Sequence, residues 1–309
     1  MSKLIDKTDI LILLTVLLAC RAAGCNNQCT VTVGVSKASN VEYAHSSAAL
    51  PNRLALDIYT PDSASPNNPV PVVVWVHGGA WYRGDKSVGT CDKINFFVGL
   101  GYVLVSVNYR LSPDPPELQN PDRIMFPVHA EDVAAAVAYI REHISTYGGD
   151  PGRIALFGHS AGAHLVALIS TDESYLASHG YGLDIIRCVG SLDVDAYDIP
   201  AAMQSLTGEL RDVFLNAFGD NAQVWEQASP INYVEAGKGI PPFLLVSRGD
   251  SSWKSIEEEF AAALDSAGVD ETMIKADLYT HVQIDTMIGA PQDDTLTPAI
   301  ERFLKNRCF

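Results

Sequence analysis

The sequence is short of positive charge. Its 309 residues contain 21 lysines and arginines against 37 aspartates and glutamates, which gives a formal net charge of -16. Proteins bind nucleic-acid phosphates through lysine and arginine, so this balance argues against a nucleic-acid partner. With 47% hydrophobic and 19% charged residues, the composition is that of a globular chain and not of a disordered one.

The apolar run near the N-terminus is too short to span a membrane. The run Ile10–Ala19 has about ten residues, whereas a membrane-spanning helix needs about 20. Preceded by Lys3 and Lys7, such a run is typical of a signal peptide. We therefore expect residues 1–28 to be a signal and tether, and residues 29–309 to form the folded domain.

Cysteines are few, and their spacing does not suggest a metal site. The six are Cys20, Cys25, Cys29, Cys91, Cys188 and Cys308. They lack the paired C-x-x-C spacing of metal ligands, so the sequence predicts no metal. In an oxidising compartment one or two disulfides would form, but the spacing does not assign the pairs.

One of these cysteines ends a lipobox-like segment. Leu17-Leu18-Ala19-Cys20 resembles the bacterial signal in which cleavage before the cysteine leaves Cys20 to be lipidated. Ala22-Ala23-Gly24-Cys25 is a weaker candidate, and ordinary cleavage near Ala23 is the alternative. We expect an exported protein that is periplasmic, secreted or attached to the outer membrane through Cys20.

Apolar strands alternate with helical segments along the rest of the chain. Runs rich in valine and other strand-forming residues predict strands at 55–61, 69–79, 101–109, 153–158, 186–194, 241–250 and 271–281. Helical spacing of apolar residues predicts helices at 126–148, 161–169, 255–268 and 297–306. This alternation predicts one α/β domain with a mostly parallel sheet, covered by helices on both faces. The irregular stretch 171–238 is expected to form a small cap over one end of the sheet.

A serine lies between two glycines at a predicted strand-to-helix junction. Gly158-His159-Ser160-Ala161-Gly162 joins the strand-like RIALFG to the helix-like AGAHLVALI. A serine at such a turn is exposed above the sheet, as in the G-x-S-x-G nucleophile elbow. Small residues are also common in ordinary turns of this kind, so the motif needs partners elsewhere in the chain.

A serine nucleophile needs a base and an acid that orients the base. Functional groups in open α/β sheets gather at the carboxyl ends of strands. That rule favours His281, which follows the last predicted strand, as the base. Asp250 ends an earlier predicted strand and gives the chain order Ser, Asp, His. Asp193, at the preceding strand, is the alternative acid.

Attack on an ester carbonyl also creates an oxyanion, which needs preorganised donors. The segment VVVWVHGGAW supplies Gly78 and Gly79 directly after a predicted strand. Because they lack side chains, their N–H groups can approach a substrate closely. The N–H of Ala161, which follows the serine, would complete the oxyanion hole.

HGGAW together with GHSAGAHL resembles the α/β-hydrolase esterases that carry an HGG oxyanion motif. These include the hormone-sensitive-lipase-like, feruloyl-esterase-like and kynurenine-formamidase-like enzymes, and the matching pieces run from about Leu54 to Phe303. The resemblance implies that Ser160 is acylated, that His281 acts as base and then acid, and that Asp250 holds His281. It implies no cofactor, and it marks Asn108-Tyr109-Arg110 and Glu131-Asp132 as structural positions.

The substrate is the least constrained part of the expectation. Trp81 and His159 are candidates for the substrate pocket, although aromatic side chains more often fill cores. Other aromatics that could line an acyl or aryl pocket are Tyr82, Tyr197, Phe214, Phe218 and Trp225. The leading hypothesis is a carboxylesterase for short acyl or aryl esters. The alternatives are an arylformamidase or amidase with the same triad, or a non-catalytic binding module on a hydrolase fold.

Overall fold

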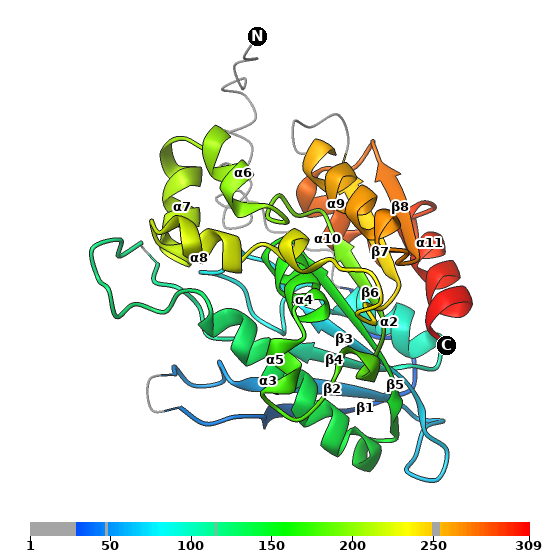
Figure 1. The fold of residues 1–309 in the computed structure, drawn as a ribbon. Coiled ribbons are helices and arrows are strands. Elements are labelled where there is room, and N and C mark those ends of the chain that lie inside the picture. The colour runs from blue at the N-terminus through cyan, green and yellow to red at the C-terminus, as the bar shows by residue number, and fades with distance from the viewer. Residues whose placement is uncertain (1–28, 47–48, 115, 249–253) are drawn as a thin grey trace.

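The computed structural model describes residues 29–46, 49–114, 116–248 and 254–309. They form an eight-stranded sheet in the order β1-β2-β4-β3-β5-β6-β7-β8 (Figure 1). The strands are β1 Val35–Glu42, β2 Ala55–Pro61, β3 Val70–Val76, β4 Val103–Val107, β5 Gly149–His159, β6 Ile186–Leu192, β7 Phe243–Arg248 and β8 Glu271–Ala276. Strand β2 runs antiparallel to both of its neighbours, and β3 to β8 are parallel. The predicted mostly parallel sheet is confirmed.

Helices cover both faces of this sheet. The helices are α2 Cys91–Gly99, α3 Val128–His143, α4 Ala161–Thr171, α5 Ser174–Ala177, α6 Ile199–Ser205, α7 Gly208–Phe218, α8 Ala222–Gln227, α9 Lys254–Ser266, α10 His281–Thr286 and α11 Leu296–Phe303. Short helical turns are η1 Ile144–Tyr147, η2 Leu183–Ile185, η3 Pro230–Tyr233 and η4 Leu304–Cys308. Figure 1 shows α3, α4 and α9 in front of the sheet, with the cap helices α6 to α8 above one end.

The alternation of side chains along β3 explains the two layers. Val72, Val74 and Val76 belong to the core shared with α3, α4 and α9. Val73 and Trp75 belong to the second core, with α2, α10 and α11. Since successive side chains of a strand point to opposite faces, a strand that is apolar at every position must be covered on both sides.

The structure narrows the expected cap. Strand β6 lies inside the range 171–238 and pairs with β5 and β7 in the middle of the sheet. The inserted part therefore begins after Leu192 and consists mainly of α6 to α8 and η3. The expected range therefore included the strand that the sequence itself predicts at 186–194, in which Gly190 lies. A Cβ at Gly190 would lie 2.2 Å from the ring of Phe157, so the small residue serves close packing.

Outside the range 171–238, three described elements have no counterpart in the predictions. Strand β1 is an edge strand whose side chains are mostly partly or fully exposed, so it lacks an apolar alternation. Helices α2 and α10 are short, and α10 has six residues. Segments of this length carry too little periodic signal to be distinguished from loops.

Two disulfides lie in the described part of the chain. Cys29 pairs with Cys91, and Cys188 pairs with Cys308. The first ties the start of the domain to α2, and the second ties β6 to the C-terminal turn η4. Cys20 and Cys25, on which the lipobox predictions rest, lie outside the described residues.

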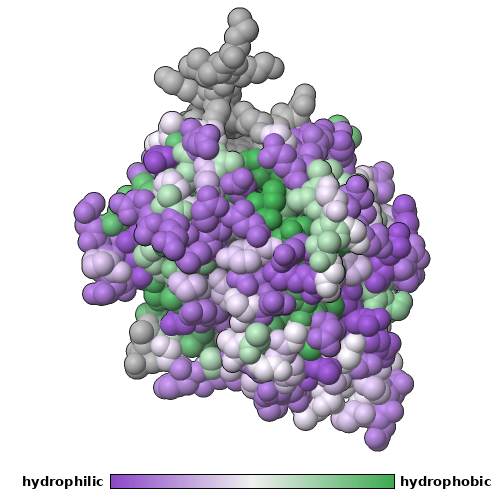
Figure 2. Space-filling model, viewed as in Figure 1, coloured by the Kyte–Doolittle hydropathy of each residue, from purple (hydrophilic) through white to green (hydrophobic). Residues whose placement is uncertain are grey.

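Polar residues cover most of the face shown in Figure 2, and hydrophobic residues show between the cap helices and α9. Within the described ranges, each helix is too short or too polar to cross a membrane. The expected structural ion pair is present, since Arg110 Nη2 lies 2.6 Å from Asp132 Oδ1. This pair joins the end of the β4 segment to α3.

Candidate functional site

Ser160 lies at the turn between β5 and α4, where the sequence predicted it. Its backbone has φ 55° and ψ -124°, a combination that a residue with a side chain adopts only under strain. The serine is partly exposed, whereas its neighbours His159 and Ala161 are buried. A strained turn that exposes one serine above the sheet is the geometry of a nucleophile elbow.

The two glycines of the motif make this turn sterically feasible. A Cβ at Gly158 would lie 2.4 Å from Gly162 O, and one at Gly162 would lie 2.1 Å from Val76 O. Both distances are far below a van der Waals contact. The glycines therefore let α4 fold back against β5 and lie directly on the end of β3.

That close packing brings the loop 77–81, called the HGG loop below, beside the serine. A Cβ at Gly78 would lie 3.1 Å from Ser160 Cβ, and one at Gly79, whose φ is 115°, would lie 2.2 Å from Arg83 O. Ala80 and Trp81 have φ values of 52° and 61°. Two consecutive non-glycine residues in the left-handed region indicate a strained loop, and such strain concentrates at functional sites.

Hydrogen bonds fix the orientation of this loop. The Tyr109 hydroxyl donates to His77 O at 3.1 Å, and His77 Nδ1 donates to Gly78 O at 2.7 Å. In a planar trans peptide the N–H points away from the C=O. The N–H of Gly78 therefore points away from the Tyr109 hydroxyl, and the N–H of Gly79 points away from the His77 ring. His77 is buried, and burial lowers the pKa of its ring to about 4, so it is a neutral donor to the loop.

His281 is the first residue of α10, and its ring contacts an acid. His281 Nδ1 lies 2.6 Å from Asp193 Oδ2. Thr280 caps the helix through a capping box with Gln283, which fixes where α10 begins. Asp193 follows β6 directly and has φ 53°. Asp193 follows β6 and His281 lies beyond β8, on the two sides of β7, so the two residues meet across the carboxyl end of β7, although 88 positions separate them.

One acid contacts the His281 ring among the described residues. Asp250 was expected to hold His281, but it lies outside the described residues. The described partner is Asp193, the alternative that the sequence offered. Burial alone would raise the pKa of Asp193, but the hydrogen bond and charge of His281 and the charge of Arg248 hold it below its usual value.

Arg248 is a contact that sequence reasoning did not find. Its Nη1 lies 3.0 Å from Asp193 Oδ2 and 2.7 Å from His281 Nδ1. A guanidinium has only donors, and a neutral imidazole nitrogen either donates or accepts. Nδ1 can therefore donate to Asp193 or accept from Arg248, but not both at once. The residue ends β7, and a strand-end arginine carries no distinctive sequence signal.

A second carboxylate balances Arg248. Asp195 Oδ2 lies 3.4 Å from Arg248 Nη2, and Asp195 Oδ1 is buried without a hydrogen-bond partner. Burial raises the pKa of Asp195 to about 6, opposed by the charge of Arg248 and assisted by that of Asp193. The carboxyl group of Asp195 therefore binds its proton more tightly than an ordinary aspartate does.

Trp81 does not line an open pocket as expected. Its side chain is 3% exposed, and its Nε1 donates to His164 Nδ1 at 3.2 Å. His164 Nε2 in turn donates to Ala228 O at 2.8 Å. The indole ring packs edge-on against Phe214 and Phe218 of α7. Trp81 thus anchors the cap to the HGG loop, because its large apolar ring gains more from packing than from exposure.

His159 is also used differently from the expectation of a pocket residue. Its Nε2 donates to His281 O at 2.8 Å, and the two ring centroids are 4.5 Å apart. Burial, followed by the charge of His281, lowers the pKa of His159 to about 4. The neutral ring therefore holds the backbone of His281 and leaves little surface for a substrate.

Three of these side chains approach each other closely enough to be considered as metal ligands. The ligand atoms of His159, Asp193 and His281 lie within 4.8 Å of one another. However, His159 Nε2 is bonded to His281 O, and His281 Nδ1 is bonded to Asp193 Oδ2. This pattern of direct hydrogen bonds fits an oriented base better than a set of free ligands.

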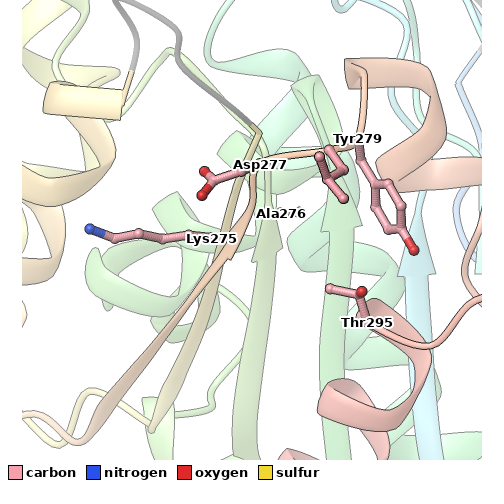
Figure 3. A pocket seen from close by; sticks show the side chains of 6 residues that line it. Lys275, Ala276, Asp277, Tyr279 and Thr295 are labelled. Carbon is pink, nitrogen blue, oxygen red and sulfur yellow. The ribbon is translucent and has the colours of Figure 1, made fainter.

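Two surface hollows lie away from the serine. One, of about 150 Å³, is lined by Lys275, Ala276, Asp277, Leu278, Tyr279 and Thr295. Figure 3 shows Tyr279 pointing towards Thr295, with Lys275 and Asp277 directed to the other side of the strand end. The other, of about 200 Å³, lies between the region of Tyr43 and α3. Ser160 lines neither, so neither is a substrate pocket for this serine.

The raised pKa of Asp195 predicts a pH-dependent effect of Asp195→Asn. Between about pH 4 and 6 the folded state holds a proton that the unfolded state has lost, so wild-type stability falls as pH rises. The Asp195→Asn variant has no carboxyl group here to deprotonate, so it does not lose this stability as pH rises. We expect it to gain up to roughly 3 kcal/mol of unfolding free energy relative to wild type at pH 7.5, and much less at pH 4. Urea unfolding at both pH values measures this, and a pH-independent difference contradicts it.

Known proteins resemble this chain in sequence. The BD-FAE family model matches residues 56–253. Esterase LipQ of Mycobacterium tuberculosis H37Rv is 33% identical over 220 residues, covering 69% of this chain and 50% of that protein. Esterase LipC of the same organism is 30% identical over 189 residues, covering 59% and 44%. The chain thus spans about half the length of the curated relatives it matches.

Solved structures share the fold over nearly the whole chain. Esterase B from Lactobacillus rhamnosis HN001 has a TM-score of 0.73 at 18% identity, covering 96% of this chain and 93% of that chain. With the family match over more than half of the sequence, these comparisons show that the chain has the α/β-hydrolase fold and belongs to the BD-FAE family.

Proposed function

We propose that the protein is a serine carboxylesterase that acts on short acyl or aryl esters through an acyl-enzyme. The observation that carries the proposal is the strained, partly exposed Ser160, with the hydrogen-bonded pair His281–Asp193 at the same carboxyl edge of the sheet. The relatives LipQ and LipC are named esterases, which supports the same chemistry here.

In the proposed acylation step, Ser160 Oγ attacks the ester carbonyl while His281 Nε2 takes its proton. The carbonyl oxygen becomes an oxyanion that the N–H groups of Gly78, Gly79 and Ala161 stabilise. Preorganised donors of this kind are worth about 10²–10³ in rate for each donor lost. His281 then gives the proton to the leaving alkoxide, so the alcohol departs neutral and the acyl group stays on Ser160.

Deacylation repeats these steps with water as the nucleophile. His281 Nε2 takes a proton from the water, the tetrahedral intermediate collapses, and Ser160 recovers its proton as the acid product leaves. Each attack, by Ser160 or by water, starts from a neutral His281 whose Nδ1 carries the proton, which is the tautomer that donates to Asp193. The imidazolium formed in each step lies beside Arg248, and the charges of Asp193 and Asp195 oppose that repulsion.

The substrate class is proposed from the relatives and the cap. The loop and cap aromatics Trp81, Phe214 and Phe218 pack against one another, which favours a compact acyl site over one for long chains. An arylformamidase would use the same triad on a formamide bond, and a non-catalytic protein would keep the fold without turnover. The experiment below separates these three outcomes.

The first test is hydrolysis of p-nitrophenyl acetate, butyrate and decanoate, with N-formylkynurenine as the formamide substrate. We expect turnover of the two short esters, and a fall of at least about 10⁴-fold in kcat for Ser160→Ala because the nucleophile is lost. Fluorophosphonate should label the wild type and spare the variant. Hydrolysis of the formamide alone would favour the arylformamidase, and a folded protein with neither activity nor labelling would favour the binding module.

A second test identifies which aspartate orients His281. Asp193→Asn should lower kcat by about 10⁴-fold, because an amide in place of the carboxylate favours the wrong tautomer of the histidine. Asp250→Asn is the matched control and should stay within a few-fold of wild type. Steady-state kinetics of the two variants on p-nitrophenyl acetate decide the matter. A large loss of kcat in Asp250→Asn, with Asp193→Asn close to wild type, would identify Asp250 as the acid that orients His281.

We also propose that the chain is exported and attached to a membrane through a lipidated Cys20. The signal-like segment before Cys20 supports this, and so do the disulfides Cys29–Cys91 and Cys188–Cys308, since such bonds persist in oxidising compartments. The acidic domain would then act on esters outside the cytoplasm.

Fractionation of a bacterial host that expresses the full chain tests the anchor. Cys20→Ser should move the protein from the membrane to the soluble fraction, because the lipid acceptor is lost, whereas Cys25→Ser should leave it on the membrane. Mass spectrometry of the N-terminal peptide checks the modification. Release by Cys25→Ser instead would select the second lipobox, and a soluble wild type would indicate ordinary cleavage near Ala23.

A further inference from the structure

The position of the candidate base depends on a very short helix. Helix α10 comprises six residues, His281–Thr286, and isolated helices of fewer than about 12 residues are marginal in water. Its capping box fixes where it starts, but tertiary contacts must hold it in place. Four residues after His281, and so one turn along, α10 carries Asp285.

Lys93 of α2 contacts this turn of α10 through a buried side chain. Its side chain is 2% exposed, and its Nζ lies 2.9 Å from Asp285 Oδ1. The same nitrogen donates to Asp285 O at 2.8 Å and to Gly89 O at 3.1 Å. It also lies 4.7 Å from the centre of the Trp75 ring. Three oxygens therefore use all three protons of this buried ammonium group, and two of them belong to one residue of α10.

Neighbouring contacts make α2 a firm support for α10. A Cβ at Gly289, just past α10, would lie 2.2 Å from Asp92 O of α2, so the two backbones touch. The disulfide Cys29–Cys91 fixes the first residue of α2, two positions before Lys93. Burial alone would raise the pKa of Asp285, but the charge of Lys93 lowers it.

The His281 residue is thus held at three points. Its ring contacts Asp193, its carbonyl accepts from His159, and its helix is tied to α2 by Lys93. The two contacts of His159 and Lys93 act on the backbone of α10, while Asp193 acts on the ring. A shift of the α10 backbone would therefore displace the whole His281 ring.

We propose that Lys93 is a positioning residue: its ion pair with Asp285 sets the place of α10 and thereby aligns His281 with Ser160. This rests on the proposed esterase function for its kinetic consequence. The contact itself stands apart from that function, because Lys93 touches neither Ser160 nor His281 in the described hydrogen bonds and ion pairs.

The test compares Lys93→Met with the double variant Lys93→Met/Asp285→Asn in the full chain. The single variant leaves a charge without its partner and should unfold at lower urea concentration. The double variant removes both charges, so its urea midpoint should return towards that of wild type. Its kcat on p-nitrophenyl acetate should nevertheless stay about 10- to 100-fold low with KM unchanged, because a small misplacement of a catalytic group costs this much.

A second buried ion pair supplies the matched control. Lys86 Nζ lies 2.8 Å from Asp57 Oδ1, and both side chains are at most 5% exposed. The remaining hydrogen bonds of Lys86 and Asp57 go to residues such as Asn40 and Asn108. Lys86→Met/Asp57→Asn should therefore leave kcat within a few-fold of wild type.

Hydrogen exchange of the α10 backbone amides gives a readout that does not need ester turnover. Exchange at 281–286 should rise in both Lys93 variants and not in the control. Recovery of kcat together with stability in the double variant, or unchanged exchange in α10, would overturn the proposal. Absence of Ser160-dependent turnover in the wild type would instead count against the proposed esterase, and the exchange result would still decide whether Lys93 holds α10.

Discussion

The site depends on how closely helix α4 can approach strand β3. With a Cβ at Gly162 the helix would collide with Val76 O at 2.1 Å, and at Gly158 with Gly162 O at 2.4 Å. The absence of two side chains thus lets the chain reverse from strand to helix within one residue. Ser160 is exposed at that reversal, and the same close approach places Gly78 against it. The nucleophile and its proposed oxyanion donors therefore share one steric constraint.

The site concentrates conformational strain and buried charge that the rest of the fold must stabilise. Ala80, Trp81, Ser160 and Asp193 all have positive φ, and each such residue costs on the order of 1–3 kcal/mol. Around His281 lie the carboxylates Asp193 and Asp195 and one guanidinium. Whole domains are stable by only about 5–15 kcal/mol. The packing of the large sheet and the disulfides must therefore offset the free-energy cost of this strain and buried charge.

The cap and the site are connected through one tryptophan. Trp81 belongs to the HGG loop, yet its ring packs on α7 and its Nε1 bonds to His164 of α4. His164 in turn bonds to Ala228 O, at the end of the cap. A change in cap sequence would therefore reach the HGG loop through Trp81, without a contact to the substrate.

Much of the fold followed from local patterns. Continuous valine runs predicted buried parallel strands, and β3 and β4 are buried on both faces. The glycines around Ser160, the Gly78-Gly79 pair and the place of His281 after β8 were all readable because each is a short-range feature of a strand end. Edge strand β1 and the short helices α2 and α10 were not, because they lack an apolar repeat of sufficient length.

The sequence by itself determined the α/β architecture, the serine turn and the set of strand-end residues from which a triad can be drawn. Tertiary structure alone decided which of them touch: Asp193 contacts His281 across 88 positions, Cys188 pairs with Cys308, and Lys93 reaches Asp285. The physical reason is that spacing along a chain encodes strands and turns, whereas distances between strand ends depend on sheet order, which leaves only β7 between β6 and β8.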